Sequence, residues 1–219
     1  MKQFAVIGLG RFGESIAKTL FSLEHDVLVI DDNQENIDNI VDYVTHAVKA
    51  DATDETVLKR LGLRNMDVIV VAIGNIQQSI MICMLLKELG VPMVVAKVQS
   101  EMHAKVLTRM GVDKVIFPER DMGIRLAHNL VSSSVLDYIE LSDDYSMVEI
   151  KADPKWHNKS LRSLNMRVAY GINVIAIRRG EEINVAPNAD EVIEKDDTLM
   201  VVGSNQSIHL LENKPERSW

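Results

Sequence analysis

The sequence predicts an α/β protein in which a Rossmann-like, doubly wound parallel sheet is followed by a small α+β C-terminal lobe. Up to residue 117, short apolar runs alternate with helical patterns, and this alternation implies crossover connections and a parallel sheet. The first run leads directly into a glycine pattern. After Pro118 the chain changes to short strands joined by tight turns. We therefore expect one domain at residues 1–134, including a connecting helix, and a second at residues 135–219.

The first apolar run, residues 4–7, has the continuous apolar character of a strand that is buried on both faces. It is followed by Gly8, Gly10 and Gly13 in the spacing Gly-x-Gly-x-x-Gly. Gly8 would allow a tight turn, Gly10 would let the backbone approach a diphosphate, and Gly13 would let the next helix pack closely. The amide groups and positive dipole end of that helix would face the anion. The alternative is a glycine-rich turn that binds nothing.

The second apolar run, residues 27–30, ends in Asp31, which lies 18 residues after Gly13. An acidic residue at this place can accept hydrogen bonds from both ribose hydroxyls and repels a 2′-phosphate. Asp31 suits NAD and ATP equally, so it does not distinguish between them.

The remaining elements follow from periodicity and from start and stop residues. In the first domain we expect helices at residues 14–23, 32–42, 55–61, 76–89 and 102–110, and strands at residues 47–51, 68–72, 94–97 and 115–117. A connecting helix should cover residues 122–131. In the second lobe we expect strands at residues 135–141, 146–151, 172–177, 182–185 and 198–202, with short helices at residues 160–164 and 206–211.

In a sheet of this type the ligand lies across the carboxyl ends of the strands. Residues at those ends are the candidate nucleotide-binding residues: Gly8, Gly10, Arg11, Phe12, Gly13, Asp31, Asp51, Ala52, Thr53, Ala72, Ile73 and Gly74. The 51–53 segment lies where an adenine usually binds, and the 72–74 segment has no bulky side chain that would block a ligand.

Two charged positions are ambiguous. Arg11 stands inside the glycine loop, where a guanidinium could reach a terminal phosphate with two hydrogen bonds, or it could be a solvated surface residue. Glu119 and Arg120 follow the last strand of the sheet. They could be exposed charges at a helix start or part of the ligand site.

Composition excludes several classes of protein. The net charge of −8 argues against a nucleic-acid-binding protein, which would need a basic face. The six histidines show no metal-ligand spacing, and neither a Gly-x-Ser-x-Gly elbow nor a Walker-type phosphate loop is present. We therefore assign no catalytic residue. Without an apparent signal peptide or an apolar run of about 20 residues, we expect a soluble cytoplasmic protein.

Several segments together resemble one protein family: residues 4–13, 51–53, 70–74, 118–122 and 164–171. They are similar to the RCK (also called KTN) regulatory subunits of bacterial potassium uptake systems, of the KtrA/KtrC and TrkA type. The likeness covers the whole chain. It implies a cytoplasmic octameric ring, assembled from dimers, that binds ATP or ADP and gates a membrane-embedded potassium translocator.

The resemblance also implies roles for individual residues. Arg11 would contact the terminal phosphate, and Glu119 would help to hold a cation near the phosphates. We also assign Arg120 to this ligand site, because it follows the last strand of the sheet next to Glu119. The C-terminal lobe looks like lobes that bind cyclic di-AMP between two subunits. The matching positions are Met166, Arg167, Ala169, Ile172, Asn173 and Pro187.

The sequence also allows other interpretations. Residues 166–173 could be an ordinary dimer surface. The whole chain could be a small NAD(H)-dependent oxidoreductase, although the second lobe offers no catalytic cluster, or it could be a plain assembly module. The connecting helix carries a wide apolar stripe, which predicts packing against a second subunit.

Overall fold

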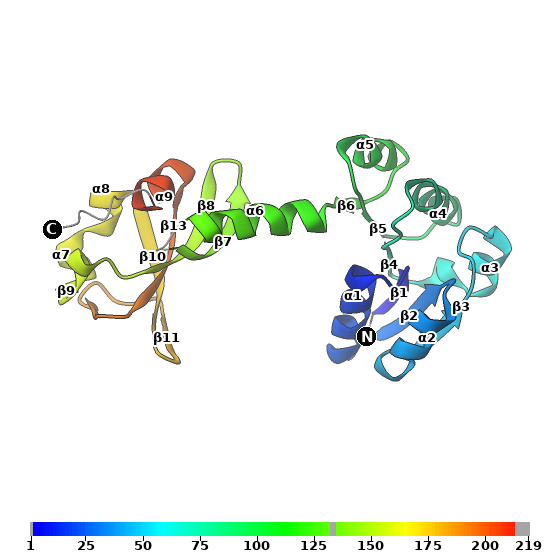
Figure 1. Ribbon diagram of the computed structural model, residues 1–219, viewed down its shortest axis with the longest axis horizontal. Helices are drawn as coiled ribbons and strands as arrows, with labels where there is room; N and C mark the ends of the chain where they lie inside the picture. Colours follow the sequence, from blue (N-terminus) through cyan, green and yellow to red (C-terminus); the bar gives the residue numbers. More distant parts are fainter. Residues whose placement is uncertain (1, 132–134, 213–219) are drawn as a thin grey trace. The chain divides into compact units, whose positions relative to one another are not determined.

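The computed structural model describes residues 2–131 and 135–212. It divides into two compact units, residues Met1–Glu119 and Arg120–Trp219 (Figure 1). The predicted domain boundary, between residues 134 and 135, lies at the edge of a segment outside the described residues and stays a prediction.

The first unit contains a parallel sheet of six strands in the order β3-β2-β1-β4-β5-β6. The strands are β1 Gln3–Ile7, β2 Asp26–Asp31, β3 His46–Lys49, β4 Val68–Val71, β5 Val94–Lys97 and β6 Lys114–Ile116. The strand order reverses between β1 and β4: β2 and β3 follow on one side of this point, and β5 and β6 on the other. The predicted doubly wound parallel sheet is confirmed, and the point of reversal is where such sheets bind ligands.

Helices cover both faces of this sheet (Figure 1). Val6 and Val29 face a core formed with α1 and α2, whereas Ile7 and Ile30 face a second core formed with α3, α4 and α5. The helices are α1 Arg11–Ser22, α2 Gln34–Ile40, α3 Glu55–Arg60, α4 Ile76–Glu88 and α5 Glu101–Arg109. The 3₁₀ turns are η1 Val41–Tyr43 and η2 Leu63–Asn65. Strands buried on both faces explain why the apolar runs are continuous rather than alternating.

The helices of this unit begin in two ways. The side chains of Asn33, Asp54, Asn75 and Ser100 accept hydrogen bonds from backbone amides in the first turns of α2, α3, α4 and α5. Such caps satisfy amides that have no partner within the helix. Helix α1 follows Gly10 and has no side-chain cap. Its first-turn amides are therefore free of side-chain competition.

The second unit is built on an antiparallel sheet of five strands in the order β11-β10-β13-β8-β7, with a separate pair of β9 and β12. The strands are β7 Val135–Ser142, β8 Tyr145–Lys151, β9 Lys159–Ser160, β10 Ile172–Arg179, β11 Glu182–Val185, β12 Val192–Ile193 and β13 Thr198–Ser204. Helices α6 Pro118–Val131, α7 Leu161–Leu164, α8 Met166–Tyr170 and α9 Asn205–Glu212 and the 3₁₀ turn η3 Pro154–Trp156 complete it. The α+β character predicted for this lobe is confirmed.

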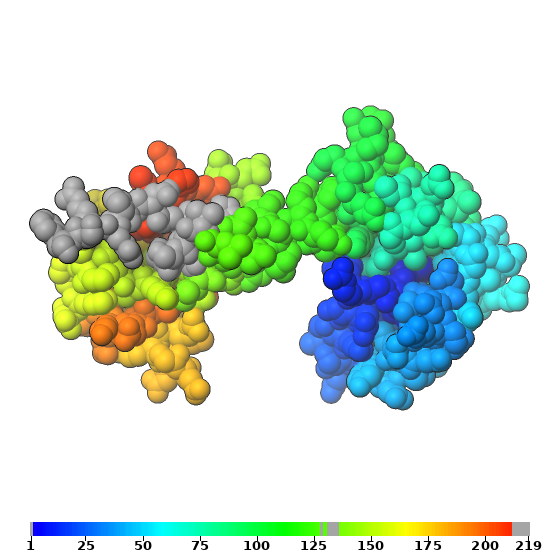
Figure 2. All heavy atoms as spheres, in the orientation of Figure 1, coloured from blue at the N-terminus to red at the C-terminus, as the bar shows by residue number. Residues whose placement is uncertain are grey.

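Trp156 and Ile172 lie in the core of this lobe, together with Leu199 and Val201 of the central strand β13. Strand β10 contributes to that core, whereas the end of the hairpin at β11 projects from the lobe (Figures 1 and 2), and all four residues of β11 are exposed. Among the described residues, no helix is long and apolar enough to span a membrane.

Candidate functional site

The three glycines of the loop differ in their surroundings. Gly8 has a φ of +93°, a conformation that side chains disfavour. A Cβ on Gly13 would lie 1.9 Å from the carbonyl oxygen of Gly8 and 3.2 Å from the side chain of Ala72. A Cβ on Gly10 would meet no atom within 4 Å. Two glycines are thus needed to build the loop, whereas Gly10 leaves open space above it.

Asp31 is held directly beside this loop. Its Oδ2 accepts a hydrogen bond of 2.6 Å from the amide of Leu9, inside the glycine sequence. Its Oδ1 accepts from the amide of Asn33 at 2.9 Å and from Nδ2 of Asn36 at 3.0 Å. A carboxylate has about four acceptor positions. Three are engaged, so Asp31 could accept both ribose hydroxyls only if Asn36 gave up its place.

The predicted residues Asp31, Asp51, Ala52, Thr53 and Ile73 line one pocket of the first unit. Within it, the side chain of Asp51 accepts hydrogen bonds from the hydroxyl and amide of Thr53, at 2.6 and 2.8 Å. These bonds hold the pKa of the Asp51 carboxyl below its ordinary value. The structure brings these five predicted residues together, and their role in nucleotide binding stays a prediction.

Sequence reasoning missed other residues of the same pocket. Asp32 follows Asp31, and Gln78 comes from the first turn of α4. The pocket also has walls from Ile7, Ile30 and Ile82. The pocket holds only about 30 Å³, far below the roughly 300–1,000 Å³ of pockets that enclose a ligand. A base could therefore enter it only if its walls moved apart. The sequence could have identified Gln78 as a pocket residue, because it lies in the first turn of the helix that follows β4 and the 72–74 segment.

The carboxyl end of β5 adds two further residues beside the loops. The amide nitrogen of the Gln99 side chain donates to the carbonyl oxygen of Gly74. The ammonium of Lys97 pairs with the carboxylate of Glu119 and lies 6.0 Å from the centre of the Phe12 ring. The sequence could have identified Lys97 as a candidate site residue, because Lys97 ends an apolar run in the same way as Asp31.

Arg11 is exposed at the start of α1. Its charge contributes to lowering the pKa of Glu119, although the hydrogen bond from Lys97 contributes most and burial opposes both. Arg120 lies in the other unit and pairs with Asp121 at 3.1 Å. Its predicted role in the ligand site remains a prediction.

Glu119 is the residue predicted to help hold a cation near the phosphates. The described residues contain no group of three histidine, cysteine or acidic side chains that could hold a metal ion. Glu119 could therefore bind a cation only together with other ligands, such as phosphate oxygens.

His103 is buried in α5, and burial lowers its pKa, which favours a neutral histidine there.

In the second unit, two of the predicted residues contact each other. Nε of Arg167 donates a hydrogen bond of 2.8 Å to Oδ1 of Asn173. Both residues and Ala169 are exposed, and Pro187 is half-buried. Met166 and Ile172, in contrast, are 5% and 0% exposed and pack in the core of the lobe. Their side chains shape the lobe from within, and their predicted ligand contact remains untested.

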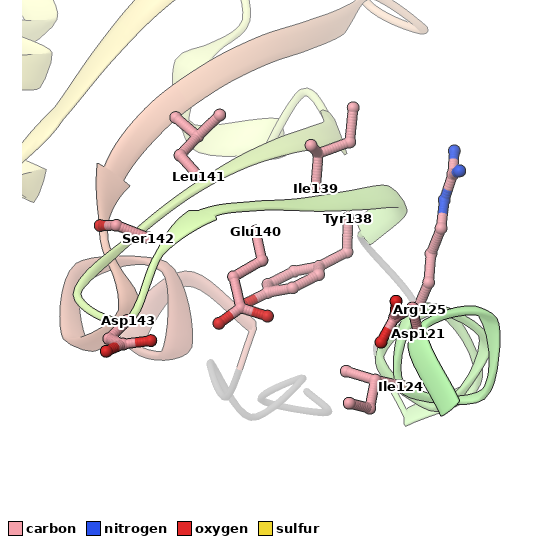
Figure 3. A pocket seen from close by; sticks show the side chains of 9 residues that line it. All are labelled: Asp121, Ile124, Arg125, Tyr138, Ile139, Glu140, Leu141, Ser142 and Asp143. Atoms are coloured by element: carbon pink, nitrogen blue, oxygen red, sulfur yellow. The ribbon is translucent and has the colours of Figure 1, made fainter. Parts of the chain in front are cut away.

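A larger hollow of about 520 Å³ lies elsewhere in the second unit, between α6 and the β7–β8 hairpin. Figure 3 shows Ile124 of α6 facing Tyr138 and Glu140 across it. Arg125 is bound to the carboxylate of Asp137 on β7. None of the predicted ligand residues lines this hollow.

The first unit thus has the architecture of a nucleotide-binding Rossmann domain, joined to a small α+β domain. Comparison with family models agrees: residues 4–118 match the TrkA-N domain and residues 145–215 match the TrkA-C domain. The chain is 49% identical over 214 residues to the Ktr system potassium uptake protein C of Bacillus subtilis (strain 168), covering 97% of each protein. It is 45% identical to the Ktr system potassium uptake protein A of that organism, covering 97% of this chain and 96% of the relative.

Among solved structures, the RCK domain of GsuK shares this fold, with a TM-score of 0.69 and 18% identity. The match covers 98% of this chain and 48% of that one. The chain belongs to the family of Ktr and Trk system potassium uptake proteins, and the family resemblance expected from the sequence is confirmed.

Proposed function

We propose that this chain is a non-catalytic regulatory subunit of a bacterial potassium uptake system. It would act in the cytoplasm, attached to the membrane through a membrane-embedded potassium translocator. The observation that supports this most strongly is an open, uncapped glycine loop at the switch point of the sheet, in a chain 49% identical to a Ktr potassium uptake protein.

The ligand of the first unit is an adenine nucleotide, ATP or ADP. The pocket between Asp31 and Thr53 would widen to take the base, Asp31 would bind the ribose, and the α1 amides the phosphates. ATP and ADP differ by one charged phosphate. A ligand shifts a conformational equilibrium only by its differential affinity for the two states. Arg11, exposed at the loop, would supply the contact that senses the last phosphate.

The second unit binds cyclic di-AMP at a two-fold axis between two subunits. This ligand has two phosphates related by such an axis, and a homodimer interface has the same symmetry. One Arg167 from each subunit would pair with one phosphate. The bond from Arg167 to Asn173 uses only Nε, which leaves the terminal nitrogens for a phosphate. Dimers would assemble into an octameric ring.

A thermal-shift titration of the full chain with ATP, ADP, NADH and NADPH tests the proposal for the first unit. We expect ATP and ADP to raise the melting temperature most and NADPH least, because Asp31 repels the 2′-phosphate. A clear preference for NADH over both adenine nucleotides would support the alternative, a small NAD(H)-dependent oxidoreductase. No shift with any of the four would indicate a plain assembly module.

A further inference from the structure

Lys97 lies at the carboxyl end of β5, beside the glycine loop, and no ligand contact is assigned to it above. It ends β5, pairs in the strand ladder with Ile116 of β6, and contacts Glu119 three residues further along the chain. Its side chain is only 15% exposed, whereas that of Glu119 is 70% exposed. A lysine ammonium this deeply enclosed would be costly to bury without a charged partner.

Four charged groups surround the glycine loop. Lys97 lies near the ring of Phe12 in the first turn of α1. Lys97 pairs with the carboxylate of Glu119 and the charge of Arg11 also acts on that carboxylate, while the carboxylate of Asp31 lies beside Leu9 of the same loop. The two positive and two negative charges at the loop therefore balance when no ligand is bound. The open space at Gly10 leaves room for an anion to approach Lys97 and Arg11.

The pair between Lys97 and Glu119 is suited to exchange. Because Lys97 is enclosed, its ammonium can leave Glu119 only for another anion. A phosphate oxygen would offer the same ammonium a charge-assisted hydrogen bond. Glu119, once released, remains solvated because it is already mostly exposed.

We propose that Lys97 is a second phosphate-binding residue, and that the terminal phosphate of a nucleotide displaces Glu119 from its ammonium. This inference rests on the proposed adenine-nucleotide site and adds the way in which that site responds. The freed carboxylate lies in the first turn of α6. Occupation of the site by phosphate would thereby change the charge presented at the start of that helix.

Calorimetric titration of the full chain with ATP, in buffer containing EDTA, tests the exchange. Lys97→Met should weaken ATP binding about tenfold or more, as expected for a lost charge-assisted contact, whereas Lys97→Arg should retain most of it. Lys87→Met is the matched control, because Lys87 is also a partly enclosed lysine paired with an acid, Asp113. This pair lies at the amino end of β5, opposite to the end where Lys97 lies. It should leave ATP affinity unchanged.

Glu119→Gln separates exchange from simple repulsion. If Glu119 competes with phosphate for Lys97, Glu119→Gln should tighten ATP binding several-fold in the natural background and have no effect in the Lys97→Met background. Equal tightening in both backgrounds, or natural ATP affinity in folded Lys97→Met protein, would overturn the inference. Absence of ATP binding by the unmodified chain would instead overturn the proposed function itself.

Discussion

At the scale of single residues, Gly10 and Gly13 separate binding from folding. Gly13→Ala would place a Cβ 1.9 Å from the Gly8 oxygen, so we expect a loss of stability of about 1–3 kcal/mol or more. The methyl group of Gly10→Ala would meet no atom of the described residues within 4 Å, so stability should stay within about 0.5 kcal/mol of the natural value. That methyl group would nevertheless occupy the space proposed for phosphate. Urea unfolding and ATP calorimetry on both variants measure the two effects.

Unchanged ATP affinity in a stable Gly10→Ala protein would show that phosphate does not approach the loop at this point. Natural stability of Gly13→Ala would show that α1 is not packed as closely as described.

Arg167 is the corresponding residue of the second lobe. Arg167→Ala should remove a charge-assisted contact of about 1.5–3 kcal/mol for each phosphate, and so abolish measurable binding of cyclic di-AMP. Calorimetry on the full chain should give one ligand per dimer for the natural protein. Arg162→Ala is a suitable control, because this arginine is exposed in the same lobe and pairs with Asp190.

Natural affinity in the Arg167→Ala variant, or one ligand per chain, would show that the pocket is wrongly assigned. The dimer itself should survive the substitution, since Arg167 is exposed and bonded only to Asn173 among its described contacts.

At the scale of elements, Arg179 and Asp197 join the strands of the second lobe. Arg179, on β10, donates bonds of 2.8 and 2.9 Å to the fully buried Asp197, just before β13, and another to the carbonyl of Val192 on β12. Burial alone would raise the pKa of Asp197. The bonds from Arg179 and from the amide of Glu194 outweigh it and hold that pKa below its usual range.

A pKa lowered in the folded state contributes stability above the unfolded value, about 3.9, and this contribution disappears as pH falls through the folded value. Asp197→Asn should therefore lower the free energy of unfolding by about 1–3 kcal/mol at pH 7. The difference from the natural protein should shrink below about pH 4. Urea titrations followed by tryptophan fluorescence measure it, because Trp156 is buried in this lobe.

Asp190→Asn is the matched control, since Asp190 and its partner Arg162 are both largely exposed. Equal losses in the two variants, or a loss at Asp197 that does not vary with pH, would contradict the role given to the buried pair.

The sequence could predict the elements whose signals are local, but not the contacts between distant segments. The strand before Gly8 and the helix after Gly13 were predictable, because apolar runs and glycine spacing are local. The pairing of β9 with β12 was not predicted, because Lys159 and Ile193 are brought together only by the folded lobe. Helix α8 was missed because its five residues are too few to show a helical period. The Arg167–Asn173 contact depends on that helix and was missed with it.

At the scale of the whole molecule, α6 predicts assembly. It leaves large apolar side chains exposed: Met122, Ile124, Leu126 and Leu130, at 59%, 43%, 54% and 76%. Such a stripe is typical of an interface. We expect light scattering to show a dimer or a larger assembly at micromolar concentration, and Leu126→Glu with Leu130→Glu to reduce its mass. Leu210→Glu, at an equally exposed leucine on α9, should not. A stable natural monomer would contradict this.

The central claim is that nucleotide bound to this chain controls a potassium translocator. The most direct measurement is potassium flux into liposomes that contain a Ktr-type translocator, with and without the full chain, at matched ATP and ADP concentrations. The account predicts that flux differs between ATP and ADP only when the chain is present, and that Arg11→Ala removes most of the difference. Equal flux with ATP and ADP in the presence of the natural chain would contradict it.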